Sequence, residues 1–187
     1  MKSLELETQR LVLRTVRVSD APAIHGYRSK PEVSRYQGRS KSLAAARSLI
    51  KRVAAIKPNT PRTWYQLAVL EKSSGELVGD IAIHFTDKEN RQAELGYTLA
   101  PEHQGKGYAT EAVVRVVEYL FKLKKHRIMA TADPRNTPSI KLMERLGMRK
   151  EAHFKKSFWT GKAWVDDVAY ALLREEWRGS AVKKRKR

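Results

Sequence analysis

The sequence predicts one α/β (α+β) domain over residues 1–179, built on a mixed sheet of about seven strands with about four helices. Three observations predict this fold class. A length of 187 residues suits one domain with a sizeable core. Strand-like and helix-like segments follow in the order strand, two helices, three strands, helix, strand, helix and two strands. Because three central strands form a meander, the sheet should be mixed rather than purely parallel.

The first elements follow from apolar spacing and from residues that begin or end helices. Alternating apolar residues predict a first strand over Arg10–Arg17. Asp20 should open a short helix over Ala21–Ser29. Ser42 should be the N-cap of a second helix, and Pro58 should end it.

Three strands should follow, over Trp64–Glu71, Leu77–Phe85 and Gln92–Leu99, with a hairpin turn at residues 72–75 between the first two. After a stretch rich in proline and glycine, a strong apolar stripe over residues 112–121 predicts a third helix. The remaining predictions are a strand over Arg127–Ala132, a helix capped by Thr137 that ends before Gly147, and strands near Glu151–Trp159 and Trp164–Leu172.

Net charge and composition narrow the classes of function. Lys and Arg number 38 against 20 Asp and Glu, which gives a net charge of +18. Such a surface attracts polyanions such as nucleic acid, ribosomes, acidic proteins or a charged cofactor, although a generic solvated basic surface is an equally good interpretation. Residues 180–187 end in five basic residues and should form a disordered tail.

Other features argue against whole classes of protein. The absence of cysteine excludes disulfides, thiolate zinc sites and a cysteine nucleophile, and it fits a cytoplasmic protein. No apolar run approaches the ~20 residues of a membrane span, and the N-terminus has no signal-peptide pattern. The five histidines show no ligand spacing, so we expect no metal.

The most informative segment is the loop from Gln104 to Thr110, between a predicted strand and a predicted helix. Gly105 and Gly107 allow a tight turn and close approach of the backbone to a ligand. The following helix offers unpaired N–H groups, and Lys106 adds a positive charge. Together these features predict a cradle for a pyrophosphate. The loop is not a P-loop, and it is a poor dinucleotide fingerprint because Thr110 replaces the third glycine.

The pattern Gln104-x-x-Gly107-x-Ala109 resembles the acetyl-CoA signature of the GCN5-related N-acetyltransferases (GNAT). Ordered blocks across the chain, from about Leu6 to Trp177, extend the resemblance. They include residues 8–14, 94–101, 136–139, 144–148, 164–166 and 170–172. The chain looks like the RimJ/RimL-like branch, which acetylates the N-termini of ribosomal proteins.

The resemblance implies a mostly antiparallel, splayed sheet whose fourth and fifth strands part to admit the pantetheine arm of acetyl-CoA. The edge of the fourth strand near Thr98 and Leu99 would pair with the pantetheine amides, and Asn136 would contact the arm from the other side. The pyrophosphate would be held by the loop residues Gln104, Gly105, Lys106, Gly107, Tyr108, Ala109 and Thr110.

Acetyl transfer to an amine needs a base for the amine, a donor for the oxyanion and a proton for the leaving thiolate. Glu94 is the candidate base, acting through a water, and a backbone N–H near Leu99 is the candidate oxyanion donor. Ser139 could reach the sulfur. Many relatives carry a tyrosine acid where this chain has Met143, which makes Ser139 the better candidate for the acid. His84 and His153 are alternative bases.

Three hypotheses for function remain open. The first is an N-acetyltransferase that acts on a protein N-terminus, with an acidic or ribosomal protein as acceptor and with ribosome or rRNA association through the basic surface. The second is an N-acetyltransferase of small-molecule amines. The third is a non-catalytic RNA- or ribosome-binding module on the same fold, which an intact loop, Asn136 and Glu94 argue against. Similar proteins are often homodimers, so a dimer is also expected.

Overall fold

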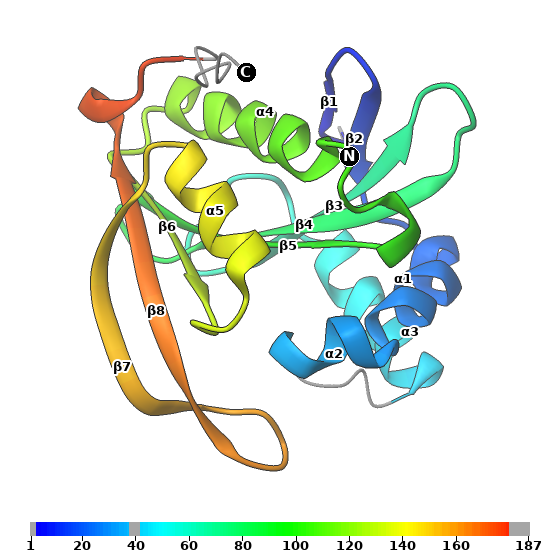
Figure 1. Cartoon of the computed structure of the whole chain (residues 1–187). Helices are drawn as coiled ribbons and strands as arrows, with labels where there is room; N and C mark the ends of the chain where they lie inside the picture. The colour runs from blue at the N-terminus through cyan, green and yellow to red at the C-terminus, as the bar shows by residue number, and fades with distance from the viewer. Residues whose placement is uncertain (1–2, 38–41, 180–187) are drawn as a thin grey trace.

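The computed structural model describes residues 3–37 and 42–179, which form one eight-stranded sheet flanked by helices (Figure 1). The strands lie in the order β1-β2-β3-β4-β5-β6-β8-β7. Their bounds are β1 Glu5–Glu7, β2 Leu11–Thr15, β3 Trp64–Glu71, β4 Leu77–Phe85, β5 Gln92–Leu99, β6 Arg127–Ala132, β7 Arg149–Trp159 and β8 Trp164–Leu173. The helices are α1 Ala21–Arg28, α2 Pro31–Gln37, α3 Leu43–Ala54, α4 Tyr108–Lys122 and α5 Thr137–Arg145, with 3-10 turns at Val18–Asp20, Pro101–His103 and Arg174–Glu176.

The sheet is mixed and mostly antiparallel, as predicted, and β5 and β6 are its parallel pair. Their pairing runs from Gln92↔Arg127 to Glu94↔Met129 and then stops. Both strands continue beyond this point, β5 to Leu99 and β6 to Ala132. The sheet is therefore splayed after Glu94, and the last part of β5 has a free backbone edge toward β6.

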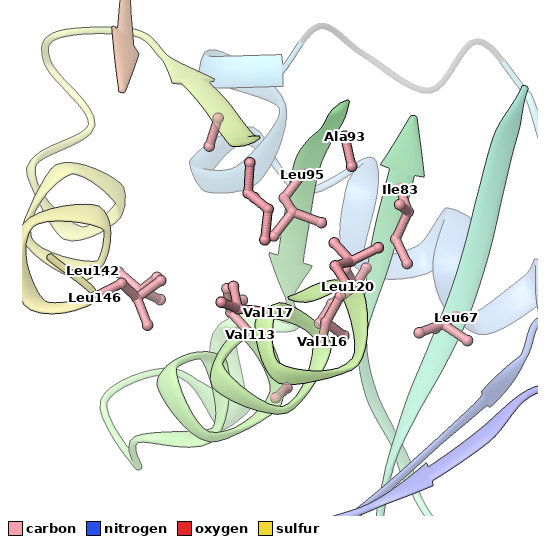
Figure 2. Packing of buried hydrophobic residues seen from close by; sticks show 14 of the residues in the cluster. Leu67, Ile83, Ala93, Leu95, Val113, Val116, Val117, Leu120, Leu142 and Leu146 are labelled. Carbon is pink, nitrogen blue, oxygen red and sulfur yellow. The ribbon is translucent and has the colours of Figure 1, made fainter. Parts of the chain in front are cut away.

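The main core lies between the sheet and the pair α4 and α5 (Figure 2). The apolar stripe of α4, with Val113, Val116, Val117 and Leu120, packs with sheet residues such as Leu95 in one buried cluster. Burial of each such side chain stabilises the fold by about 1.5–3 kcal/mol. This packing fixes the N-terminus of α4 at the open end of the splay.

Helices α1, α2 and α3 cover the opposite face of the sheet (Figure 1). The buried carboxylate of Asp80 on β4 joins α1 to this face. It accepts hydrogen bonds from Arg28 at 2.6 Å and from Gln66 at 2.8 Å, and it also pairs with the Tyr27 hydroxyl. Because Arg28 and Tyr27 are both on α1, this network holds α1 and the adjoining α2 beside β5.

The predicted numbers of strands and of helices are each one too low, because β1 and α2 were not expected. β1 has three residues and buries only Leu6 within the strand, too short for an alternating pattern to stand out. α2 buries only Val33 and so has no apolar stripe. The predicted tail at residues 180–187 lies outside the described residues.

The start of α5 is a smaller correction. Thr137 was predicted as the cap, but the N-cap is Asn136, whose Oδ1 accepts a hydrogen bond from the Ser139 amide at 3.3 Å. Asparagine is a favoured N-cap residue. Proline favours the first helical position, so Pro138 predicted Thr137, the residue before it, as the cap. Among the described residues, no helix has the length and apolar character needed to cross a membrane.

Candidate active site

A cleft of about 820 Å³ opens where β5 and β6 part. Its walls are the free edge of β5, the loop before α4, the first turns of α5, helix α2 and the strands β7 and β8. One end lies at the glycine loop, and the other opens between α2 and the β7–β8 hairpin, where Tyr36 and Phe158 line it. The cleft thus joins the two faces of the sheet through the splay.

The glycine loop has the backbone conformation that the sequence predicted. Gly105 has φ +75° and Gly107 has φ +83°, both in the left-handed region that glycine favours. Gly107 is the N-cap of α4, so the unpaired N–H groups and positive dipole end of that helix lie at the cleft. Gln104, Ala109 and Thr110 also line the cleft. An anionic phosphate is the ligand that this arrangement favours.

Arg10, directly before β2, holds the loop in place from outside the cleft. Its Nη1 donates to the Lys106 carbonyl oxygen at 3.0 Å, and its Nε donates to Glu111 at 2.7 Å. Glu111 also accepts from the Thr8 hydroxyl at 2.6 Å, and these hydrogen bonds together with the Arg10 charge hold its pKa below the ordinary value despite burial. Sequence reasoning missed this brace because Arg10 and Glu111 lie 101 residues apart.

Two loop residues lie outside the cleft lining, and two cationic residues of α5 lie within it. Lys106 and Tyr108 are not among the described residues that line the cleft, and the Tyr108 hydroxyl bonds to Glu71 instead. Lys141 and Arg145 on α5 line the cleft, and Arg145 donates to the Thr110 hydroxyl at 2.9 Å. The cationic side chains that line the cleft beside the loop therefore come from α5.

The free edge of β5 presents backbone groups to the cleft. The Tyr97 carbonyl accepts from the Gln37 amide at 3.4 Å, and the Leu99 carbonyl accepts from the Gln104 amide at 3.1 Å. The side chain of Thr98 instead donates to Gln37 Oε1 at 2.8 Å. Alternate residues of a strand direct their backbone groups to opposite edges, so Tyr97 and Leu99 offer the edge that an extended amide chain could pair with.

A pair of hydroxyls stands between this edge and α5. The Tyr97 and Ser139 hydroxyl oxygens lie 2.9 Å apart, and Ser139 lines the cleft beside the N-cap Asn136. Burial raises the pKa of Tyr97 to about 12, although its hydrogen bond with Ser139 acts the other way. Tyr97 therefore keeps its proton at neutral pH. Met143 is fully buried in the core, so it has no place in the cleft.

Glu94 lies on the face of β5 opposite the main core, just before the splay begins. Neighbouring Ala93 and Leu95 belong to the main core, so Glu94 points toward the face that carries α1, α2 and α3. Its Oε2 lies 3.6 Å from His84 Nδ1, and the His84 ring stacks on Trp64 with ring centroids 4.5 Å apart. Glu94 is about a quarter exposed and is not among the described residues that line the cleft.

Three tryptophans on the strands β3, β7 and β8 are largely exposed. The exposed fractions of Trp64, Trp159 and Trp164 are 46%, 50% and 58%. Trp159 and Trp164 contact each other at the tip of the β7–β8 hairpin, with ring centroids 5.4 Å apart. His153, an alternative base, is held by Asp166 at 2.7 Å instead.

Comparison with known proteins decides the family. The model of the acetyltransferase (GNAT) domain matches residues 10–149 of the chain. The chain belongs to the GNAT acetyltransferase family. An uncharacterized N-acetyltransferase of Bacillus licheniformis, p20, is 33% identical over 177 residues, which cover 93% of this chain and 98% of that protein.

Two further relatives of this acetyltransferase come from the ribosomal-protein branch. The ribosomal protein uS5-alanine N-acetyltransferase of Escherichia coli is 37% identical over 84 residues, 44% of this chain and 43% of that protein. The structure of Mycobacterium smegmatis RimJ in complex with CoA-disulfide has a TM-score of 0.81 at 26% identity, covering 96% of this chain and 90% of RimJ. The chain is an acetyl-CoA-dependent N-acetyltransferase.

The residues of this acetyltransferase fit coenzyme A. The left-handed glycines and the start of α4 suit a pyrophosphate, and the cations of α5 add charge at the same end. The carbonyls of Tyr97 and Leu99, which accept from the side chains of Gln37 and Gln104 and have no strand partner, suit the amides of a pantetheine arm, and Ser139 also lines the cleft. The sequence did not indicate the contacts of Gln37 and Arg10, because each residue bonds to a partner far away in the chain.

Proposed function

We propose that this acetyltransferase acetylates the N-terminal α-amine of a protein, of the ribosomal-protein type. The observation that carries the proposal is the open acceptor end of the cleft, between α2 and the β7–β8 hairpin, with Tyr36 and Phe158 on its walls. An extended peptide needs such an open approach, whereas a small amine is more often enclosed. The likeness to RimJ and to the uS5-alanine enzyme supports the same acceptor class.

In this proposal the reacting groups come from the two sides of the splay. Acetyl-CoA supplies an activated acetyl thioester. Glu94, with His84 beside it, takes the proton of the amine through a water, and the Leu99 N–H stabilises the oxyanion. Ser139, whose hydroxyl is bonded to Tyr97, gives a proton or a hydrogen bond to the leaving thiolate. Because burial raises the pKa of Tyr97 to about 12, Tyr97 keeps its proton at neutral pH and can donate a hydrogen bond to Ser139.

A screen of acceptors tests the proposal. The purified protein should acetylate peptides that carry the N-terminal sequences of ribosomal proteins, and mass spectrometry should place the acetyl group on the α-amine. Each peptide has a control in which the α-amine is already acetylated, so that only lysine side chains remain. Acetylation of small amines with no peptide acetylated would contradict the proposal and support the second hypothesis from the sequence.

Replacement of Ser139 by alanine should lower kcat by about 100-fold, because it removes the group that assists the leaving thiolate. The dissociation constant for acetyl-CoA should stay within about twofold, since the loop that holds the phosphates is unaltered. Steady-state kinetics and calorimetry measure the two quantities. Ser73→Ala, in the turn between β3 and β4, is the matched control. Normal kcat in Ser139→Ala would exclude this role.

The basic surface supports further proposals about partners. A net charge of +18 suits an acidic acceptor protein or the rRNA near a ribosomal acceptor, and such association should weaken as salt rises. The cytoplasm is the compartment we propose, in keeping with the absence of cysteine. A homodimer also stays a proposal.

A further inference from the structure

Asp167 is a carboxylate of the cleft that the reaction scheme above does not use. The pairing of β6 with β8 ends at Ala132↔Val168, so Asp167 is the first residue of β8 beyond that ladder. Val168 and Tyr170 belong to the main core beneath α4 and α5, and side chains alternate along a strand. Asp167 therefore points to the opposite face of the sheet, the face that carries Glu94, and it lines the cleft.

The neighbours of Asp167 set it apart from the adjacent carboxylate of Asp166. Burial, together with the charges of Glu94 and Asp133, raises the pKa of Asp167, while hydrogen bonds from the Val168 amide and Thr131 act against this. Asp166 instead accepts bonds from the Lys156 amide at 2.9 Å and from His153 at 2.7 Å, which lower its pKa to about 2. Of the two, Asp167 is the carboxylate suited to exchange a proton.

Glu94 alone is less well placed than the sequence suggested. It lies next to His84 and outside the cleft lining. Asp167 is in the lining, and it is near enough to Glu94 that the charge of Glu94 raises its pKa. An ammonium group brought to this face would meet two carboxylates, one from β5 and one from β8, on either side of the splay. Opposite charges attract strongly where water is partly excluded.

We propose that Asp167 is a second catalytic carboxylate, which receives the ammonium group of the acceptor and takes a proton from it. In this step an N–H bond breaks and its proton passes to the Asp167 carboxylate. The freed nitrogen lone pair forms a bond to the acetyl carbonyl carbon, and the second N–H proton passes through a water to Glu94. The C–S bond then breaks, and the thiolate leaves with a hydrogen bond from Ser139. The inference rests on the acetyltransferase reaction and holds for any primary amine, peptide or small molecule.

The titration of Asp167 depends on the charged groups around the acceptor end of the cleft. These are Glu94 on β5, Asp133 after β6, Asp166 on β8, Glu32 and Arg35 on α2, and His153 and Lys155 on β7, which bond to Asp166. Because the carboxylate is the active form, kcat/KM should fall as the pH decreases through a pKa above the ordinary aspartate value of 3.8.

The experiment compares Asp167→Asn with wild type, using alaninamide and N-terminal peptides as amine probes and the release of free thiol as the assay. We expect kcat/KM to fall by about 100-fold or more, because the removed group is a general base. The decrease of kcat/KM at acid pH should also change. Calorimetry should show acetyl-CoA binding within about twofold of wild type. Asp167→Glu should restore part of the rate, and Glu175→Gln, which removes one acidic charge on the turn after β8, is the matched control.

A second measurement needs no acceptor. Carbon-13 NMR of the aspartate carboxyls, with Asp167→Asn used for assignment, should show that Asp167 titrates above 3.8 in the wild type. A wild-type rate and pH profile in Asp167→Asn, or titration of Asp167 below 3.8, would overturn the proposal. If alaninamide is acetylated and peptides are not, the proposed acceptor class fails while the test of Asp167 still stands.

Discussion

Gly107→Trp is expected to raise the dissociation constant for acetyl-CoA at least ~100-fold, equivalent to about 2.8 kcal/mol. Gly107 has φ +83°, and an L-residue in this region costs about 1–2 kcal/mol. A Cβ there would also lie 3.4 Å from Arg10 Nη2, so the tryptophan side chain must either displace Arg10 or enter the cleft. Calorimetric titration with acetyl-CoA measures the loss.

The control for this variant is Gly75→Trp in the turn between β3 and β4. Gly75 has φ +70°, and a Cβ there would meet nothing within 4 Å, so the variant carries similar backbone strain away from the cleft. It should bind acetyl-CoA as the wild type does. Tight binding by a folded Gly107→Trp would show that the loop does not hold the phosphates. Weak binding by both variants would point to a general loss of structure.

Gly79→Ala is expected to lower the free energy of unfolding by about 3 kcal/mol. Gly79 on β4 pairs with Leu99 on β5, and a Cβ at this position would lie 2.4 Å from the Thr98 carbonyl oxygen and 2.5 Å from a Leu99 methyl carbon. The first contact is with backbone, which cannot rotate away as a side chain can. The strand must move, and the free edge of β5 moves with it. Denaturation in urea measures the change.

Gly96→Ala is the matched control on the partner strand β5. A Cβ at Gly96 would have Ala82 Cβ as its nearest neighbour, at 3.9 Å, an ordinary contact. Its stability should stay within about 1 kcal/mol of the wild type. Equal stability of Gly79→Ala and wild type would mean that β4 and β5 can separate without cost. The close approach at Gly79 would then have no part in shaping the cleft.

Local signals in the sequence predicted most elements and the glycine loop. The apolar stripe of α4 and the alternation in β3, β4 and β5 are periodic, and periodicity depends only on neighbouring residues. Gly105 and Gly107 stood out for the same reason, because the left-handed turn they form is a property of the residues themselves. The family resemblance added Glu94, Asn136 and Ser139, whose types and order matched.

The tertiary structure alone decided which residues meet at the cleft. Arg10 bonds to Glu111 from 101 positions away, and Gln37 reaches the Tyr97 carbonyl from 60 positions away. No local pattern encodes such pairs, since they depend on how β2, α2 and the sheet pack. Asp167 lies on the same face of the sheet as Glu94 because β8 pairs with β6, and this pairing ends at Val168, one residue before Asp167 along the ladder. The sequence by itself determined the loop and the kind of ligand that suits it, and the packing of distant strands determined which carboxylates share one face of the sheet.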